Sequence, residues 1–327
     1  MKSFRTTFRF KQCDKGINHS SNIITIGSCF SEVIGERLVD SKFNALVNPF
    51  GTTFNPASIF NLLIKSITGK ALDPDLYLNR HDHFFHYQLH SSFRGTSVET
   101  LEKKIEKTLI KVSEQLESAT HLFITLGTAF VYRLLENGRM VANCHKQPQK
   151  FFSKSLLGLD EMMEDFNAFY QKIMLINPGI QVVLTVSPVR HTKDGISQNQ
   201  LSKSLLNVLC HQLVAAYPEI YYFPAYEIMM DDLRDYRFYK DDMIHPSFMA
   251  EEYIYEQFQM AFFNEETKDL IQHIDQIKRN LNHRPFNPQS ETHQKFLLKL
   301  QELISLMPEN LDFSLEKQSI EEQLRLF

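Results

Sequence analysis

Short runs of apolar, β-branched residues alternate along this chain with longer segments of helical periodicity, and this alternation restricts the fold most. Four of the short runs have the length of buried strands, and they cover residues 23–26, 122–127, 182–187 and 220–223. Strands that alternate with helices pack as a parallel sheet, because each crossover connection lays a helix on a face of the sheet. We therefore predict a three-layer α/β/α fold around a parallel sheet.

The segments between these runs carry apolar stripes at helical spacing. One stripe runs from Val98 to Leu116, a second from Met162 to Ile173 and a third from Leu201 to Leu209. Ligands of parallel sheets bind beyond the carboxyl ends of the strands. The sequences GSCFS, GTAF and SPVRH all fall at such ends, so we expect a site there.

The character of the chain changes after about residue 263. Two amphipathic stripes follow, at 270–281 and 296–307, with no strand-like run between or after them. We interpret residues 1–263 as an α/β domain and residues 264–327 as a helical C-terminal extension. Amphipathic stripes usually face a core, so we expect the extension to pack on the main domain. A homodimer or a partner-binding element formed by these helices is the alternative.

Composition excludes several classes of function. The net charge is −4 and both signs are mixed along the chain, so we expect no nucleic-acid partner. No window has the apolar length of a membrane span, and the N-terminus lacks the apolar core of a signal peptide. The four irregularly spaced cysteines indicate free thiols in a cytoplasmic protein. No Walker or Rossmann glycine pattern occurs, so we expect no nucleotide cofactor.

The turn after the first predicted strand places two potential nucleophiles, Ser28 and Cys29, side by side. Consecutive side chains leave a strand on opposite sides, so at most one of them faces a site. Backbone amides at the start of the following helix lower the pKa of a thiol, and a nearby imidazole lowers it further. The alternative is a buried packing cysteine beside a serine that caps the helix.

A second motif, DDMIHPS, contains Asp242 and His245 at Asp-x-x-His spacing. Pro246 disfavours helical geometry at His245, so the histidine belongs to the loop before a helix that Ser247 can cap. An aspartate at this spacing can hold Nδ1 of the imidazole and leave Nε2 free to accept a proton from a nucleophile. By itself the spacing also fits a surface histidine in a capped loop.

The histidines and cysteines of this chain are also candidate metal ligands. Cys144 and His145, together with Cys29 and His245, would make a Cys₂His₂ set. Side chains of adjacent residues diverge, however, and the spacing matches no compact zinc motif, so we predict no metal site. The histidine-rich run at 81–90 is interpreted as a substrate rim or plain surface.

The strand–turn–helix with a nucleophile, followed late in the domain by an Asp-x-x-His loop, resembles the layout of the SGNH/GDSL hydrolases. The stretch of about 20–260 resembles the GSCFA family, which takes its name from the turn, although Ser31 stands where that name has alanine. Its further matching segments are NPFGTTFNPASI, TLGTAFVYR, VANCHKQP, TVSPVRH, NQLSKSLL and YFPAYEIMMDDLRDYRFYKDDMIHPS. The resemblance implies a flavodoxin-like SGNH sheet and a hydrolase or acyltransferase acting on an ester or thioester. Acylated carbohydrates and lipids are the substrate classes it implies.

The resemblance also implies roles for residues. Gly27 matches the glycine of the superfamily's Gly-Asp-Ser turn, which puts Cys29 at the nucleophile position, with Ser28 as the alternative. His245 would accept the proton of the nucleophile and return it to the leaving group, and Asp242 would orient His245.

The oxyanion hole that the resemblance implies is altered in this chain. Gly51 matches the glycine donor, but the third block begins at Gly127 and lacks the superfamily's asparagine. Thr128 and Asn143 are the candidate replacements, since loss of one donor costs about a hundredfold or more in rate. This departure also fits a second hypothesis, a binding or scaffold protein that keeps the fold and uses the helical extension as its interaction surface.

Three more residues are candidates for substrate binding. His145 lies beside Asn143, whereas Arg190 and His191 end a predicted strand on the same side of the sheet. Either Arg190 or His191 can bind an anionic group or solvate the end of a loop.

Overall fold

The central feature of the fold is a parallel sheet of five strands. The computed structural model describes residues 6–8, 11–283 and 285–325. The sheet has the order β10-β9-β5-β1-β2, and all its pairs are parallel. The strands are β1 (Asn22–Gly27), β2 (Asn44–Val47), β5 (His121–Leu126), β9 (Gln181–Val186) and β10 (Tyr221–Tyr222). Read from β2, they follow the chain as second, first, third, fourth and fifth, so the predicted flavodoxin-like sheet is confirmed.

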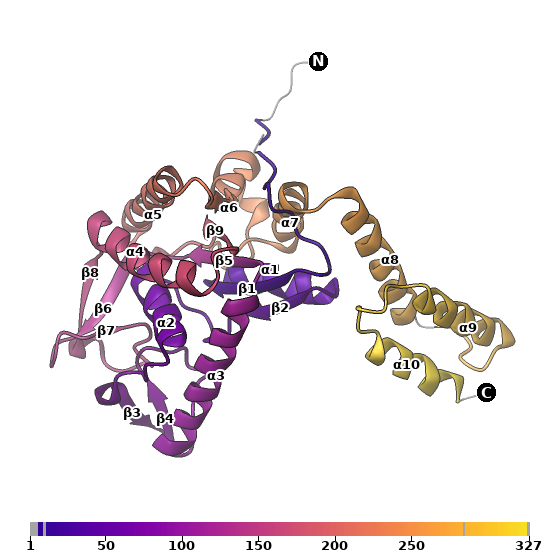
Figure 1. Cartoon of the computed structure of the whole chain (residues 1–327), viewed down its shortest axis with the longest axis horizontal. Coiled ribbons are helices and arrows are strands. Elements are labelled where there is room, and N and C mark those ends of the chain that lie inside the picture. Colours follow the sequence, from indigo (N-terminus) through magenta and orange to yellow (C-terminus); the bar gives the residue numbers. More distant parts are fainter. Residues whose placement is uncertain (1–5, 9–10, 284, 326–327) are drawn as a thin grey trace.

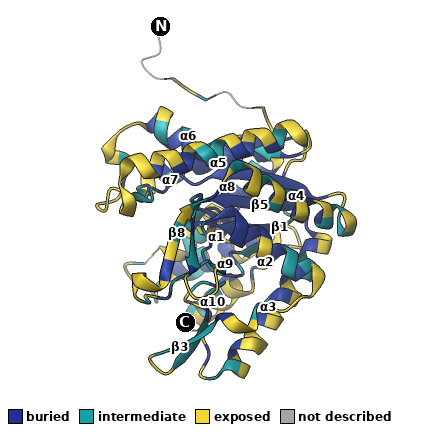
Figure 2. Ribbon diagram, turned by 90° about the vertical axis from the view of Figure 1, so that its left-hand side faces the viewer, coloured by how far each residue is buried: buried dark blue, intermediate teal, exposed yellow. Residues whose placement is uncertain are grey.

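Helices cover both faces of this sheet, which confirms the three-layer prediction (Figure 1). One face packs against α2 (Pro56–Thr68), α3 (Val98–Ser118), α4 (Leu159–Ile176) and α5 (Ile196–Ala216). The other packs against α1 (Cys29–Asp40), α6 (Ala225–Glu227) and α7 (Phe248–Phe262). With both faces covered, β1 and β5 are buried almost throughout (Figure 2).

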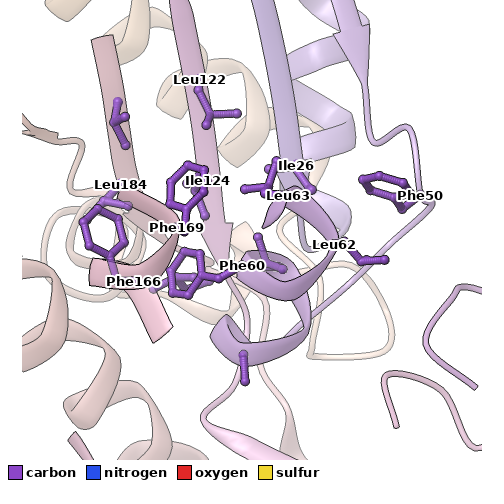
Figure 3. Packing of buried hydrophobic residues seen from close by; sticks show 14 of the residues in the cluster. Ile26, Phe50, Phe60, Leu62, Leu63, Leu122, Ile124, Phe166, Phe169 and Leu184 are labelled. Carbon is purple, nitrogen blue, oxygen red and sulfur yellow. The ribbon is translucent and has the colours of Figure 1, made fainter. Parts of the chain in front are cut away.

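Alternate residues of each strand point to the two layers. Ile26, Ile124 and Leu184 pack toward α2 and α4, where Phe60 and Phe166 join them (Figure 3). Residues at the alternate positions of the same strands join the second core with α1 and α7: Ile23, Phe123 and Val183. This two-residue period is the reason why the strand segments read as continuous apolar runs.

Two antiparallel additions, which the sequence analysis does not predict, interrupt the alternation. One is the hairpin of β3 (Tyr77–Arg80) and β4 (His83–His86), which holds the histidine-rich run. The other is a three-stranded sheet of β6 (Phe130–Leu134), β7 (Met140–Val141) and β8 (Phe152–Leu156). It directly follows the third block of the resemblance and so overhangs the carboxyl end of β5.

The C-terminal part is helical, as predicted, and comprises α8 (Glu265–Asn282), α9 (Glu291–Ser305) and α10 (Ser314–Leu324). These helices share an apolar core of their own, on one side of the molecule (Figure 1). They contact the α1–β2 region through an ion pair of 2.7 Å between Lys42 and Glu316. A second pair joins Lys278 to Asp40 at 3.2 Å. Within the described residues, no helix is long and apolar enough to cross a membrane.

Candidate active site

The turn between β1 and α1 is held in one conformation by its surroundings. Gly27 has a φ of +137°, and a Cβ there would lie 2.1 Å from the carbonyl oxygen of Thr125, so only glycine fits. The Gly27 amide donates to Oδ1 of Asn48 at 2.9 Å. Ser28 is fully buried, and its Oγ accepts a hydrogen bond from the amide of Phe30 at 3.3 Å. Ser28 is therefore the N-cap of α1.

Cys29 is the first residue of α1 and, unlike Ser28, is only partly buried. Burial raises the pKa of its thiol, while the amides of Cys29 and Phe30 and the charge of Lys203 act to lower that pKa. The expectation of a lowered thiol pKa is therefore wrong for the free protein, because desolvation outweighs the helix amides. Of the two adjacent candidates, Cys29 is the one that solvent reaches.

Lys203, which the sequence analysis does not single out, is a fully buried cation beside this turn. Its Nζ donates to the carbonyl oxygens of Gly127 and Ser187, at 2.7 Å each. These two residues follow the carboxyl ends of β5 and β9. Burial lowers the pKa of Lys203 to about 7, and interaction with the Cys29 thiolate raises it.

The register of the sheet explains why Lys203 and Cys29 meet. Gly27 of β1 is paired with Thr125 of β5, so Cys29 and Gly127 each lie two residues beyond that pair. The ammonium bound to the Gly127 carbonyl is thereby brought to the turn. The sequence contains one indication that Lys203 is buried, which is its position on the same buried face of α5 as Leu206.

The DDMIHPS loop forms the contact expected of its spacing. Nδ1 of His245 donates to Oδ2 of Asp242 at 2.7 Å. Oδ1 of Asp242 accepts from the amides of Ile244 and His245, at 2.8 and 2.9 Å. The His245 amide, then its ring and then the Ile244 amide lower the pKa of Asp242 to about 2. Oγ of Ser247 accepts from the Ala250 amide at 3.4 Å and caps α7.

Arg190 and His191, in the segment that follows β9, connect this loop to α5. The amide of Arg190 donates to the carbonyl oxygen of Ile244 at 3.2 Å, so the segment lies against the His245 loop. The amide of the next residue, His191, donates to Oδ1 of Asn199 on α5 at 2.8 Å.

The His191 ring interacts electrostatically with Lys203 and with His245. Burial, together with the charges of Lys203 and His245, lowers its pKa to about 3, so the ring is neutral at pH 7. Its buried Nε2 has no hydrogen-bond partner within the described structure. A Cβ on Gly127 would lie 3.2 Å from this Nε2. Electrostatic contacts thus run from Cys29 through Lys203 and His191 to His245.

The groups expected to hold an oxyanion have other partners. The amide of Gly51 donates to the carbonyl oxygen of Asn48 at 2.7 Å, so this amide already has a hydrogen-bond partner. Oγ1 of Thr128 accepts from the Phe130 amide at 3.1 Å and lies 3.0 Å from Oγ of Ser202. Both groups therefore stabilise the loops around the turn.

Asn143 and His145 lie against the β3–β4 hairpin. Oδ1 of Asn143 accepts from the His145 amide at 2.8 Å, and the Asn143 amide donates to the Tyr87 carbonyl at 3.1 Å. Nε2 of the buried His145 donates to the His86 carbonyl at 2.9 Å. In the described part of the chain, no contact links either residue to the Cys29 turn. All four cysteines are free thiols, and the described residues contain no metal-ligand cluster.

Buried histidines make the stability of the fold sensitive to acid. Burial lowers the pKa of His86 and of His191 to about 3. Above pH 6.5 both rings are neutral in the folded and unfolded chain. As the pH falls from 6.5 toward 3, the unfolded chain binds protons that the folded chain refuses, so the free energy of unfolding decreases.

We expect a loss of roughly 2 kcal/mol per histidine at pH 5, measured by urea unfolding between pH 4 and 7.5. The variant His86→Gln should show a shallower decrease, whereas His273→Gln, at an exposed position of α8, should match the wild type. An equal decrease in all three proteins would contradict the prediction.

Comparison with known proteins adds a family and a distant structural similarity. The GSCFA family model matches residues 22–258, and the model described as GSCFA domain protein, C-terminal domain, matches residues 274–326. The crystal structure of a carbohydrate esterase family 3 from Talaromyces cellulolyticus is similar with a TM-score of 0.34 and 10% identity. That similarity covers 78% of this chain and 99% of the esterase, and it is too weak to indicate the chemistry of the site. No curated protein matches the chain.

Proposed function

The chain belongs to the GSCFA family, and we propose that it is an SGNH-like hydrolase or acyltransferase that forms a covalent acyl-enzyme from an ester or thioester. One observation carries this proposal. A partly accessible thiol at a helix N-terminus lies near a buried lysine, and the loop of an Asp–His pair packs against the segment that follows β9.

Cys29 is the proposed nucleophile. It is reached by solvent, it begins α1 and it interacts with the Lys203 ammonium, whereas Ser28 is buried and its hydroxyl already caps the helix. A thiolate is also the better nucleophile near neutral pH. The four thiols are free, which suits a reducing compartment, and we place the protein in the cytoplasm.

His245 is the proposed base and acid. The Asp242 carboxylate holds its Nδ1, so Nε2 carries the lone pair that accepts the thiol proton. The thiolate then attacks the carbonyl carbon, a carbon–sulfur bond forms and the bond to the alcohol or thiol breaks. His245 returns the proton to this leaving group. Water or an acceptor alcohol then releases the acyl group and regenerates the thiol.

Lys203 is the proposed source of electrostatic stabilisation. In a buried site with an effective dielectric constant far below that of water, the protonated form of Lys203 favours a thiolate strongly. Its carbonyl partners hold the charge in place before the reaction, so no reorganisation is required. The amide of Cys29, at the first turn of α1, is the donor we assign to the developing oxyanion.

The test is to trap the acyl-enzyme. Wild-type protein is mixed with para-nitrophenyl acetate or an acetyl thioester, quenched in acid during turnover and mapped by mass spectrometry. We expect an acetyl group on Cys29, formed much more slowly in His245→Ala. An adduct on Ser28 would make serine the nucleophile.

A second function is favoured by the hydrogen-bond partners that the Gly51 amide and the Thr128 hydroxyl already have, because these leave few groups for an oxyanion. In that case the chain is a binding or scaffold protein with α8–α10 as its interaction surface. Absence of any acyl adduct across a panel of esters and thioesters, with the protein folded, would support this function over the enzymatic one.

A further inference from the structure

A cleft of about 400 Å³ lies next to the proposed catalytic groups. Its wall includes His191 and Thr128, which flank Gly127, and Ile244, which precedes His245. It therefore adjoins the loop of His245 and the segment that holds Gly127. The cleft is lined by charged as well as apolar side chains.

The cleft has an excess of positive charge. Lys154, Arg190 and Lys193 line it, and Asp194 is the carboxylate among the lining residues. Asp194 forms an ion pair with Lys154. Among the described residues, no carboxylate lies within ion-pair distance of Arg190 or Lys193. A protein with a net charge of −4 thus keeps two uncompensated cations beside its site.

Arg190 is held in a position that suits an oxyanion. Its guanidinium carbon lies 4.4 Å from the centre of the Tyr239 ring, and its backbone amide is bound to Ile244. The Tyr239 ring and hydroxyl both interact with the guanidinium, and its remaining N–H groups can donate hydrogen bonds to a carboxylate or phosphate.

Aromatic side chains also line the cleft. They are Phe54, Phe130 and Tyr132, and the Lys154 ammonium lies over two of them, 4.6 Å from the Phe130 ring centre and 5.2 Å from that of Tyr132. The edges and uncovered faces of these rings can pack against a flat or ring-shaped group. The aromatic side chains and the cations therefore select for a ring that bears a negative charge.

We propose that this cleft binds the non-acyl part of the substrate, and that this part is a ring carrying a carboxylate or phosphate. The proposal rests on the acyl-transfer function proposed above. It assigns Arg190 and Lys193 as the residues that select the charged substrate.

The first arm of the test compares two esters that differ in charge, para-acetoxybenzoate and its methyl ester. We expect wild-type kcat/KM to favour the charged ester, and Arg190→Gln or Lys193→Gln to lower that preference about tenfold, as for one charge-assisted hydrogen bond. Added salt should lower the preference as well. The control Lys107→Gln changes an exposed lysine on α3 and should keep the wild-type ratio.

The second arm measures binding alone, by calorimetry, with para-hydroxybenzoate, its methyl ester and para-hydroxyphenyl phosphate. Tighter binding of either anion, weakened about tenfold in Arg190→Gln, supports the subsite and shows which anion is preferred. If binding shows this pattern but neither ester turns over, the subsite stands and the proposed hydrolysis fails. A charge preference that is absent, or unchanged in both variants, overturns the subsite.

Discussion

Replacing Cys29 with alanine is expected to lower kcat on a reactive aryl ester by at least about a thousandfold, as losses of nucleophiles do in other acyl-transfer enzymes. The physical reason is that no other accessible nucleophile lies at the turn, because the Ser28 hydroxyl is buried and bonded to the Phe30 amide. The measurement is single-turnover release of para-nitrophenol by wild-type protein and by Cys29→Ala. Stability should change little, because Cys29 is only partly buried.

Ser28→Ala is the matched control, one residue away. Loss of the cap should cost about 1 kcal/mol in the free energy of unfolding, measured with urea, while the folded protein keeps its turnover. The opposite pattern, with activity lost in Ser28→Ala and kept in Cys29→Ala, would assign the nucleophile to serine. Activity retained in both variants would mean that the turn is structural.

Replacing Lys203 with methionine is expected to raise the pKa of Cys29 further and to slow its alkylation by iodoacetamide at pH 7.5 by tenfold or more. The reason is that burial already raises the pKa of this thiol, and Lys203 is one of the groups that oppose the rise. The measurement is the rate of alkylation at Cys29 from pH 6 to 10, followed by mass spectrometry. Turnover of the aryl ester should fall with it.

A second measurement, the pH dependence of stability, distinguishes a structural role of Lys203 from an electrostatic one. Burial lowers the pKa of Lys203 to about 7 in the folded chain, below its value of 10.5 when unfolded. Between pH 7 and 9 the unfolded chain therefore binds the extra proton, and the free energy of unfolding should rise with pH by roughly 1 kcal/mol per unit. This rise should be absent in Lys203→Met and present in Lys107→Met.

If Lys203→Met folds and its Cys29 reacts at the wild-type rate, Lys203 only supports the strand ends. Its loss leaves the Gly127 and Ser187 carbonyls without their donor, so some destabilisation is expected in either case. Lys203→Arg, which keeps the charge, should recover part of the alkylation rate only if the charge is what matters.

Periodicity alone was enough to predict the layers of the fold. The predicted strands at 122–127 and 182–187 differ from β5 and β9 by only one residue at each end. The prediction is this close because buried strands form continuous apolar runs in the sequence. β2 was missed, since this edge strand is short and only partly buried. The β6–β8 sheet was missed because its strands are also only partly buried and form no continuous apolar run.

Within the site, the sequence by itself determined what depends on near neighbours. Asp242 and His245 are three residues apart in a loop, so their contact follows from local geometry. Gly27 and the cap at Ser28 are likewise properties of one turn. The choice between Ser28 and Cys29 stayed open, because it depends on which side chain the rest of the protein buries.

Only the tertiary structure shows which of the two side chains is buried, the direction in which the pKa of Cys29 shifts and the contacts that Lys203 makes. Each of these depends on desolvation and on charges from strands and helices far apart in the sequence. Lys203 reaches the turn because the register of β1 and β5 sets Gly127 beside Cys29. Hydrophobic patterning specifies which faces meet, but burial of an individual charge arises only when those faces have packed.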